Sequence, residues 1–326
     1  MLVTSGAIGV GMKKLGFKAK PRNMALKQAC AALGQASLMK IYEDLFSLFH
    51  LQCAQILVSH DDFENIGRMV HLSNTLEALF SKDVIPIVNE NDALAVDEIK
   101  VGDNDTLGAL LVSMIGASKL VIITDVKGLY TGNPSLSTSR LIPYVDNIDD
   151  SVWNLVADSN SQLGTGGMET KLKAGVIAND FGADMIIMGN DDLCLLSKSL
   201  DGGVGTMFKG NCLLTVRDHW LLFKNNSRGT IKIDQEAMKT IKEGYSLLPK
   251  GIIGICQEFG ANACVDVMCN GEFVAKGIVN YSSDLLNAYL KGNYAIKYDV
   301  IHACNLVLIG GRYGRFIKPI NQNKRG

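Results

Sequence analysis

Short apolar runs rich in β-branched residues alternate with segments of helical periodicity through the first two thirds of the chain. No other feature restricts the fold as strongly. The expected strands are Ala54–Val58, Val84–Val88, Leu120–Thr124 and Asp184–Met188. The helical patterns between them span Met24–Phe49, Ile66–Ser81, Thr106–Gly116 and Met168–Phe181. Strands that alternate with helices of this length predict an α/β fold, with a largely parallel sheet sandwiched by helices. Pro86 interrupts the second run and favours a place near a strand end or a bulge.

The pattern changes after residue 209, where short segments follow one another with a turn every eight to twelve residues. The expected strands are Arg217–Phe223, Thr230–Ile233, Gly251–Gln257, Cys264–Cys269 and Phe273–Val279, and one helix is expected over Gln235–Glu243. Such spacing predicts a small β-rich barrel or sandwich. The boundary between the two domains is expected near residues 210–228.

The charge of the chain is divided unevenly between these two regions. Of the 326 residues, the first 216 carry 17 Lys and Arg against 24 Asp and Glu, a net of −7, and the remainder carry 15 against 9, a net of +6. The near-neutral total argues against a protein devoted to nucleic-acid binding. Eight cysteines without a CxxC pair, no apolar stretch of eighteen residues and no signal peptide predict free thiols in a cytoplasmic protein.

The run Val84–Val88 leads directly into Asn89-Glu-Asn-Asp92. Ligands of parallel α/β sheets bind beyond the carboxyl ends of the strands. Four amide or carboxylate side chains at one strand end can therefore hydrogen-bond a small polar zwitterion. The alternative is an Asx-turn that simply ends the strand.

The segment Gly102-Asp-Asn-Asp-Thr106 comes immediately before a helical pattern. Asp and Asn cap helices well, which is the simplest interpretation. Two carboxylates beside an asparagine exceed what a cap requires, and an acidic residue here can orient a lysine or hold Mg²⁺.

Thr124-Asp125 ends the next strand, and the loop that follows contains two glycines and an Asn-Pro pair. Such a loop can line a nucleotide base or ribose. An ordinary turn is the commoner meaning of this composition.

Gly164-Thr-Gly-Gly-Met-Glu-Thr-Lys171 opens a helix. Glycines let backbone N–H groups approach a phosphate closely, and the helix dipole favours an anion at this end. Lys171 can then reach a transferring phosphoryl group. The alternative is a flexible hinge before the helix, and neither a P-loop nor a dinucleotide-binding pattern is present.

Thr4-Ser5-Gly6-Ala7 follows the first strand, and Gly9 and Gly11 lie just beyond it. A hydroxyl and backbone amides at this position can meet an anion. By itself this fragment is a weak signal.

Taken together and in order, these segments resemble the amino acid kinase family from Met1 to about Leu308. The matching stretches are Val3–Ile8, Ala32–Gln35, Gln55–Leu57, Ile87–Asp92, Ile99–Asp105, Thr124–Asp125, Lys127–Thr131 and Gly164–Lys171. The resemblance is to the members that phosphorylate the γ-carboxylate of L-glutamate, the first step of proline biosynthesis. It implies ATP and Mg²⁺ as cofactors, a small-molecule substrate, a homo-oligomer and no membrane partner.

The resemblance also implies roles for individual residues. Lys171 would stabilise the transferred phosphoryl group, and Asp105 would organise the catalytic lysines. Contacts to the amino acid would come from Ser5, Asp92 and Asn104, supported by Asn89 and Asp103. The ATP site would comprise Thr124, Asp125, Thr165, Gly166, Gly167, Met168, Glu169, Thr170 and Lys171; no metal ligand is assigned.

The resemblance divides the chain into a kinase domain (1–210), a PUA-like domain (228–305) and a tail (306–326). PUA domains often bind RNA, and the basic balance of this region permits it, although a small-molecule enzyme is the expected function. The alternatives are a kinase for another carboxylate, or a non-catalytic, RNA-binding or regulatory relative.

One departure from the family pattern lies at the N-terminus. Members carry a strand, a helix and a second catalytic lysine before the Thr-Ser-Gly-Ala segment, whereas here Met1 lies inside the second strand. A unit of about 30–50 residues is therefore expected to be missing. We accordingly expect weak or no kinase activity from the chain by itself, and an exposed, aggregation-prone sheet edge.

Overall fold

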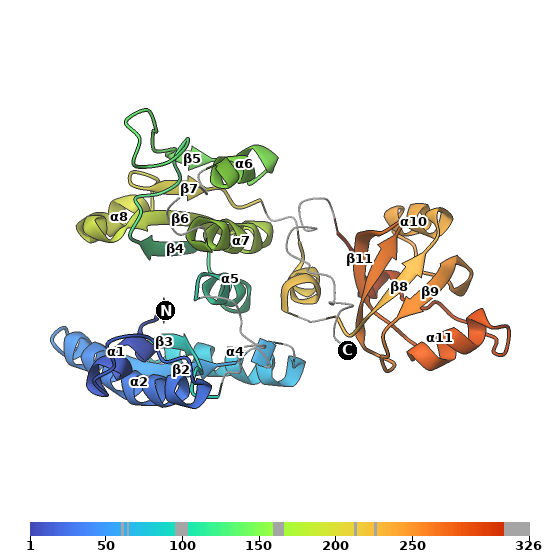
Figure 1. Cartoon of the computed structure of the whole chain (residues 1–326), viewed down its shortest axis with the longest axis horizontal. Coiled ribbons are helices and arrows are strands. Elements are labelled where there is room, and N and C mark those ends of the chain that lie inside the picture. Colours follow the sequence, from blue (N-terminus) through green and yellow to red (C-terminus); the bar gives the residue numbers. More distant parts are fainter. Residues whose placement is uncertain are drawn as a thin grey trace. The chain divides into compact units, whose positions relative to one another are not determined.

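Two compact units make up the chain, residues Met1–Leu213 and Leu214–Gly326 (Figure 1). The structure is a computed structural model and describes residues 1–59, 62–63, 65–94, 104–158, 166–211, 214–224 and 227–309.

A three-stranded parallel sheet opens the first unit. Strand β3 (Val84–Glu90) lies between β1 (Leu2–Val3) and β2 (Gln52–Val58). Strand β1 pairs only with Ile87 and Val88, so β3 has one described neighbour at Pro86, where Ala54 of β2 is opposite. A proline that lacks the ladder N–H is tolerated at such a half-paired position, although it lies inside the strand rather than near its end.

Two helices, α1 (Ala7–Lys14) and α2 (Met24–Ser47), pack against each other with their backbones in contact. A Cβ added to Gly11 would lie 1.8 Å from the carbonyl oxygen of Cys30, and one added to Gly34 would lie 1.7 Å from that of Ala7. Only hydrogen fits at either position. Gly11 therefore serves helix packing.

The second sheet of this unit has the order β4-β6-β7-β5. Strand β4 (Lys119–Thr124) is parallel to β6 (Asp184–Gly189), and β5 (Tyr144–Val145) is parallel to β7 (Thr206–Phe208). Strands β6 and β7 are antiparallel. The expected α/β class with largely parallel strands is confirmed, but the described strands form two sheets and not one.

Helix α5 (Asn104–Ile115) links the two sheets of this unit, because it contacts β1 and β3 as well as β4. It also packs along α7 (Gly166–Phe181). Seven consecutive residues of α5, from Leu107 to Ser113, are buried, as expected for a helix covered on several sides. The other helices of the unit are α4 (Ile66–Phe80), α6 (Asp150–Asp158), η1 (Asn190–Leu195) and α8 (Leu196–Ser199).

The second unit is built on a five-stranded sheet of order β12-β11-β10-β8-β9. Its strands are β8 (Gly229–Ile233), β9 (Ile252–Cys256), β10 (Cys264–Cys269), β11 (Glu272–Ile278) and β12 (Leu306–Leu308). Helices α10 (Gln235–Lys242), η3 (Pro249–Gly251), α11 (Ser283–Leu290) and η4 (Ala303–Asn305) follow β8 along the chain. Within the described residues β9 and β12 form its two open edges, so the sheet does not close into the expected barrel. The segment 306–326, expected as a tail, contributes β12, and its residues 310–326 lie outside the described part of the chain.

One strand prediction is wrong. Residues Arg217–Phe223 are helical, with α9 (Val216–His219) running into the π-helical turn η2 (Trp220–Lys224). Leu221 and Leu222 are buried, and the backbone carbonyl of Leu222 accepts a hydrogen bond from the buried Lys276 ammonium at 3.3 Å. Short apolar runs do not distinguish strand from helix, and here the packing decides.

No helix in the described ranges is both long and apolar enough to cross a membrane.

Candidate functional site

The first side chains predicted to bind a ligand follow β1. Ser5 is exposed two residues after the end of the strand, and Gly6 follows with a φ of 99° at the start of α1. The backbone N–H of Thr4 donates to the carbonyl of Val88 at 2.9 Å, so the end of β1 lies against the end of β3. The carboxyl ends of these parallel strands therefore meet at one edge of the sheet, as the sequence predicts.

Asn89, the penultimate residue of β3, is 2% exposed and connects this edge to α5. Its Oδ1 accepts from the Nδ2 group of Asn104 at 3.3 Å, and the same Nδ2 donates to the carbonyl of Thr4 at 2.6 Å. The amides of Asn89 and Asn104 thus connect the end of β1, the end of β3 and the start of α5, which are far apart in sequence. The predicted pair Asn89 and Asn104 is brought together here, whereas Asp103 lies outside the described residues.

A cavity of about 280 Å³ opens at the same edge. Of the predicted substrate residues in the described part of the chain, Asp92 lines it, and Ala7, two residues after Ser5, is also on its wall. Glu90 lines it as well, so two carboxylates face a small space. An acidic wall of this kind suits a ligand that carries an ammonium group.

Sequence reasoning missed two residues of this cavity, Gln35 of α2 and Gln55 of β2. Gln35 is buried, and its Oε1 accepts from Asn89 Nδ2 at 2.9 Å. The available signal was a polar residue on a buried helix face whose other members are Cys30, Ala31 and Gly34. A buried amide among small and apolar side chains needs a hydrogen-bond partner, and the partner of Gln35 is Asn89 of the site.

Lys171 and Asp105 form an ion pair, with 2.8 Å between Nζ and Oδ2. Asp105 lies in the first turn of α5 and Lys171 in the second turn of α7. Both helices lead into a parallel strand of the second sheet and therefore begin at the edge where those strands end. The side chain of Asp105 is 21% exposed and that of Lys171 is 12% exposed, so the pair is largely shielded from solvent but reaches the surface.

The start of α7 retains features of an anion site. No described atom lies within 4 Å of where a Cβ of Gly167 would be, which leaves the backbone there open to a ligand. Thr170 donates to the carbonyl of Gly167 at 3.0 Å, and Glu169 pairs with Lys173 at 2.7 Å. Gly166 and Met168 also belong to this first turn, while Gly164 and Thr165 lie outside the described residues.

Thr124 ends β4 and Asp125 follows it at the same edge, where the Thr124 hydroxyl donates to Asp125 Oδ1 at 3.0 Å. The loop beyond them is anchored to the sheet. The Oγ1 of Thr206 accepts from Leu129 N at 2.8 Å and donates to Ile142 O at 2.6 Å. Thr206 of β7 therefore holds the loop at Leu129 and Ile142.

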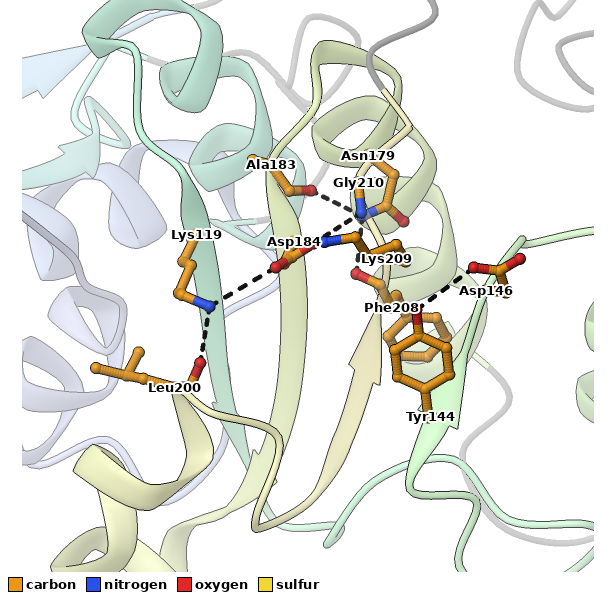
Figure 2. Close-up of polar contacts among 10 residues, drawn as sticks. All are labelled: Lys119, Tyr144, Asp146, Asn179, Ala183, Asp184, Leu200, Phe208, Lys209 and Gly210. Carbon is orange, nitrogen blue, oxygen red and sulfur yellow. Dashed lines mark hydrogen bonds and ion pairs between the residues drawn. The ribbon is translucent and has the colours of Figure 1, made fainter.

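A second lysine–aspartate cluster lies at the opposite edge, where β4 and β6 begin (Figure 2). Asp184 accepts from the backbone N–H of Gly210 at 2.9 Å and from Lys209 Nζ at 3.2 Å, and Lys119 Nζ lies 3.6 Å away. Burial acts to raise the pKa of Asp184, but the Gly210 hydrogen bond and the two ammonium charges outweigh it and lower the pKa.

Comparison with known proteins gives two family matches. The model of the amino acid kinase family matches residues 1–189, and that of the PUA domain matches residues 229–301. Together they span most of both units.

Two relatives carry the same name. The chain is 39% identical over 323 residues to a glutamate 5-kinase of Geobacter sulfurreducens, covering 95% of this chain and 87% of that one. It is 41% identical over 291 residues to a glutamate 5-kinase of Proteus mirabilis, covering 88% and 79%. Among solved structures, an isopentenyl phosphate kinase of T. acidophilum is 14% identical with a TM-score of 0.42, covering 61% of this chain and 78% of that one.

Proposed function

Because the chain belongs to the amino acid kinase family, we propose that it transfers the γ-phosphoryl group of ATP to the γ-carboxylate of L-glutamate. The observation that carries this proposal is the Lys171–Asp105 pair, at the starts of two helices that begin at the strand-end edge. The names of the relatives that align along most of the chain support glutamate as the acceptor.

The proposed reaction has an electrostatic obstacle more than a chemical one. A carboxylate oxygen attacks the γ-phosphorus, and the bond from that phosphorus to the bridging oxygen of ADP breaks. The products are γ-glutamyl phosphate and ADP. With an unperturbed pKa near 4.3, the γ-carboxylate is already ionised at neutral pH and needs no general base. The enzyme must instead bring a carboxylate and a polyphosphate together against their charge repulsion.

Lys171 is suited to offset that repulsion. Its ammonium carries three N–H donors, and among the described residues it contacts a single carboxylate, that of Asp105. Asp105 would fix the direction of the ammonium, and the remaining donors would meet the oxygens of the phosphoryl group. As negative charge spreads over those oxygens during transfer, a fixed cation lowers the barrier.

We assign the remaining predicted residues to two sites. Ser5, Asp92 and Asn104 would contact the amino acid, with Asn89 and Asp103 in support. Thr124, Asp125 and the start of α7 from Thr165 to Lys171 would bind ATP, with the triphosphate at the helix N-terminus.

Mg²⁺ fits this site as a phosphate complex. Among the described residues no three His, Cys, Asp or Glu side chains are arranged to hold a metal, and Asp105 is already bonded to Lys171. Nucleotide-bound Mg²⁺ is held largely by phosphate oxygens and water, with one or two carboxylates at most. The ion would neutralise part of the charge on the phosphates.

For the second unit we propose a PUA domain over residues 228–305, and we place phosphoryl transfer in residues 1–210. The family match over residues 229–301 supports this division. We further propose a cytoplasmic homo-oligomer whose substrate is a small molecule and not RNA.

The test is a hydroxamate assay with ATP, Mg²⁺ and L-glutamate. It is run on the chain and on a version extended at the N-terminus by the strand–helix unit that the family resemblance places before Thr4. Trapped γ-glutamyl hydroxamate from either protein is the expected result, and aspartate and N-acetylglutamate are the competing acceptors. Absence of product from both proteins, together with tight, salt-sensitive RNA binding, would overturn the proposal in favour of an RNA-binding relative.

A further inference from the structure

Gln35 is a buried amide in a helix face that is otherwise made of small or apolar side chains. It is 7% exposed on α2, next to Gly34 and near Ala31. A buried amide without partners costs about 1–3 kcal/mol, so its hydrogen bonds matter to the fold. They also matter to the site, because Gln35 lines the cavity that Asp92 lines.

The hydrogen bond between Gln35 and Asn89 has a direction. Gln35 Oε1 accepts from Asn89 Nδ2 at 2.9 Å, and Asn89 Oδ1 accepts from the backbone N–H of Glu90 at 2.9 Å. If the Asn89 amide turned over, its Nδ2 would face that N–H, donor against donor, and its oxygen would face the oxygen of Gln35. The acceptor on Gln35 and the backbone N–H of Glu90 therefore favour the same one of the two orientations of Asn89.

That orientation determines what Asn104 can do. Asn89 Oδ1 also receives Asn104 Nδ2 at 3.3 Å, and Thr4 O receives the same nitrogen at 2.6 Å. With both of its N–H groups directed to these acceptors, Asn104 has its carbonyl oxygen as the one amide atom left for a ligand. An oxygen in that place accepts from an ammonium, whereas a turned amide would offer a donor.

We infer that Gln35 is a positioning residue for the amino-acid substrate. It holds Asn89, and through it Asn104, in the orientation that accepts the substrate. This inference rests on the proposed function and adds a residue to it. Gln35 acts on substrate binding and not on phosphoryl transfer, because its contacts are to Asn89 and to Gln55 at 3.5 Å, and not to Lys171 or Asp105.

The test compares three variants in the extended protein. Gln35→Met keeps the length of the side chain and removes both hydrogen bonds. Gln35→Glu keeps an acceptor for Asn89, and the exposed Gln55 can turn its amide to donate to the new carboxylate. Gln52→Met makes the same chemical change at an exposed glutamine at the start of β2.

Glutamate affinity is measured by calorimetry without nucleotide, and kcat and both KM values by the hydroxamate assay. Gln35→Met is expected to weaken glutamate binding and raise its KM by about tenfold, the effect of roughly one buried hydrogen bond. Its kcat and its KM for ATP are expected to stay within about twofold. Gln35→Glu restores glutamate affinity to near wild type, and Gln52→Met leaves it unchanged.

Two outcomes overturn the inference while the wild type still binds glutamate. One is unchanged affinity in Gln35→Met. The other is a loss that Gln35→Glu shares in full, because the acceptor that residue 35 offers to Asn89 would then not be what maintains glutamate binding. A wild type that binds no glutamate defeats the proposed function instead, which separates the two failures.

Discussion

The first unit contains two lysine–aspartate clusters on opposite edges of its sheets, and they differ in how fully the carboxylate is engaged. Asp184, where β6 begins, receives a backbone N–H and an ammonium within 3.2 Å, with a second ammonium at 3.6 Å. Lys119 also donates to the carbonyl of Leu200 at 2.7 Å (Figure 2). Asp105, at the start of α5, is paired with Lys171 at 2.8 Å.

This difference separates a structural role from a chemical one. At the amino edge the donors are used to hold β4, β6 and the chain after β7 in place, so little capacity remains for a ligand. At the carboxyl edge the pair lies beside the open start of α7, where a phosphate can be received. The same two residue types therefore serve stability at one edge and, by our proposal, catalysis at the other.

The largest expected effect is the difference in kcat between two variants, in each of which one of the two lysines is replaced by alanine. In the extended protein, Lys171→Ala lowers kcat by about 10²–10³, the loss typical of one group that stabilises transition-state charge. Lys119→Ala leaves kcat within twofold, because its contacts lie at the far edge. Steady-state kinetics on both variants measures this. An equal loss of kcat in the two variants would contradict the assignment of catalysis to one edge and stability to the other.

For the free energy of unfolding, the substitution at the amino edge is expected to have the larger effect. Asp184→Asn keeps the shape of the side chain but loses its charge, and should lower the free energy of unfolding of the first unit by about 1–2 kcal/mol. Asp105→Asn should lower it by less than about 1 kcal/mol while reducing kcat. Urea denaturation followed by circular dichroism provides the comparison, and a larger stability loss in Asp105→Asn would contradict it.

The smallest effect is a pH dependence at Asp184. Its pKa is lowered in the folded protein, so its ionised form stabilises the fold above the unfolded value of about 3.9. That contribution is lost as the pH falls through the lower folded pKa. The stability difference between wild type and Asp184→Asn should therefore shrink between pH 6 and pH 3 in urea titrations. A difference that stays constant over this range would mean that the carboxylate charge contributes nothing.

Most of the secondary structure could be predicted from local patterns. Apolar runs located β2, β3, β4 and β6 to within two residues at each end, and the acidic and glycine-rich segments located the starts of α5 and α7. These features depend on residues that are near one another in the chain. Segment Arg217–Phe223 was misassigned because its pattern is short and its conformation depends on packing.

The contacts within the site depend on long-range pairing, which a single sequence does not display. Lys171 and Asp105 are 66 residues apart, and Gln35 and Asn89 are 54 apart. Residue chemistry alone favoured the lysine and the aspartate as candidates. The family resemblance places Gln35 in a matching stretch but gives it no role, and only the folded chain shows that it meets Asn89.

The backbone contact between α1 and α2 also limits how the adjacent cavity can evolve or be engineered. At Gly11 and Gly34 the two main chains leave no room for a side chain, so the separation of these helices cannot be adjusted by residue choice there. Their share of the cavity wall is largely alanine, from Ala7, Ala31 and Ala32. The larger side chains of the wall come from Gln35 of α2, from Gln55 and Leu57 of β2, and from Glu90–Asp92. Selection for a longer or shorter ligand would therefore have to act on these larger side chains, with the backbones of the helix pair held at a fixed separation.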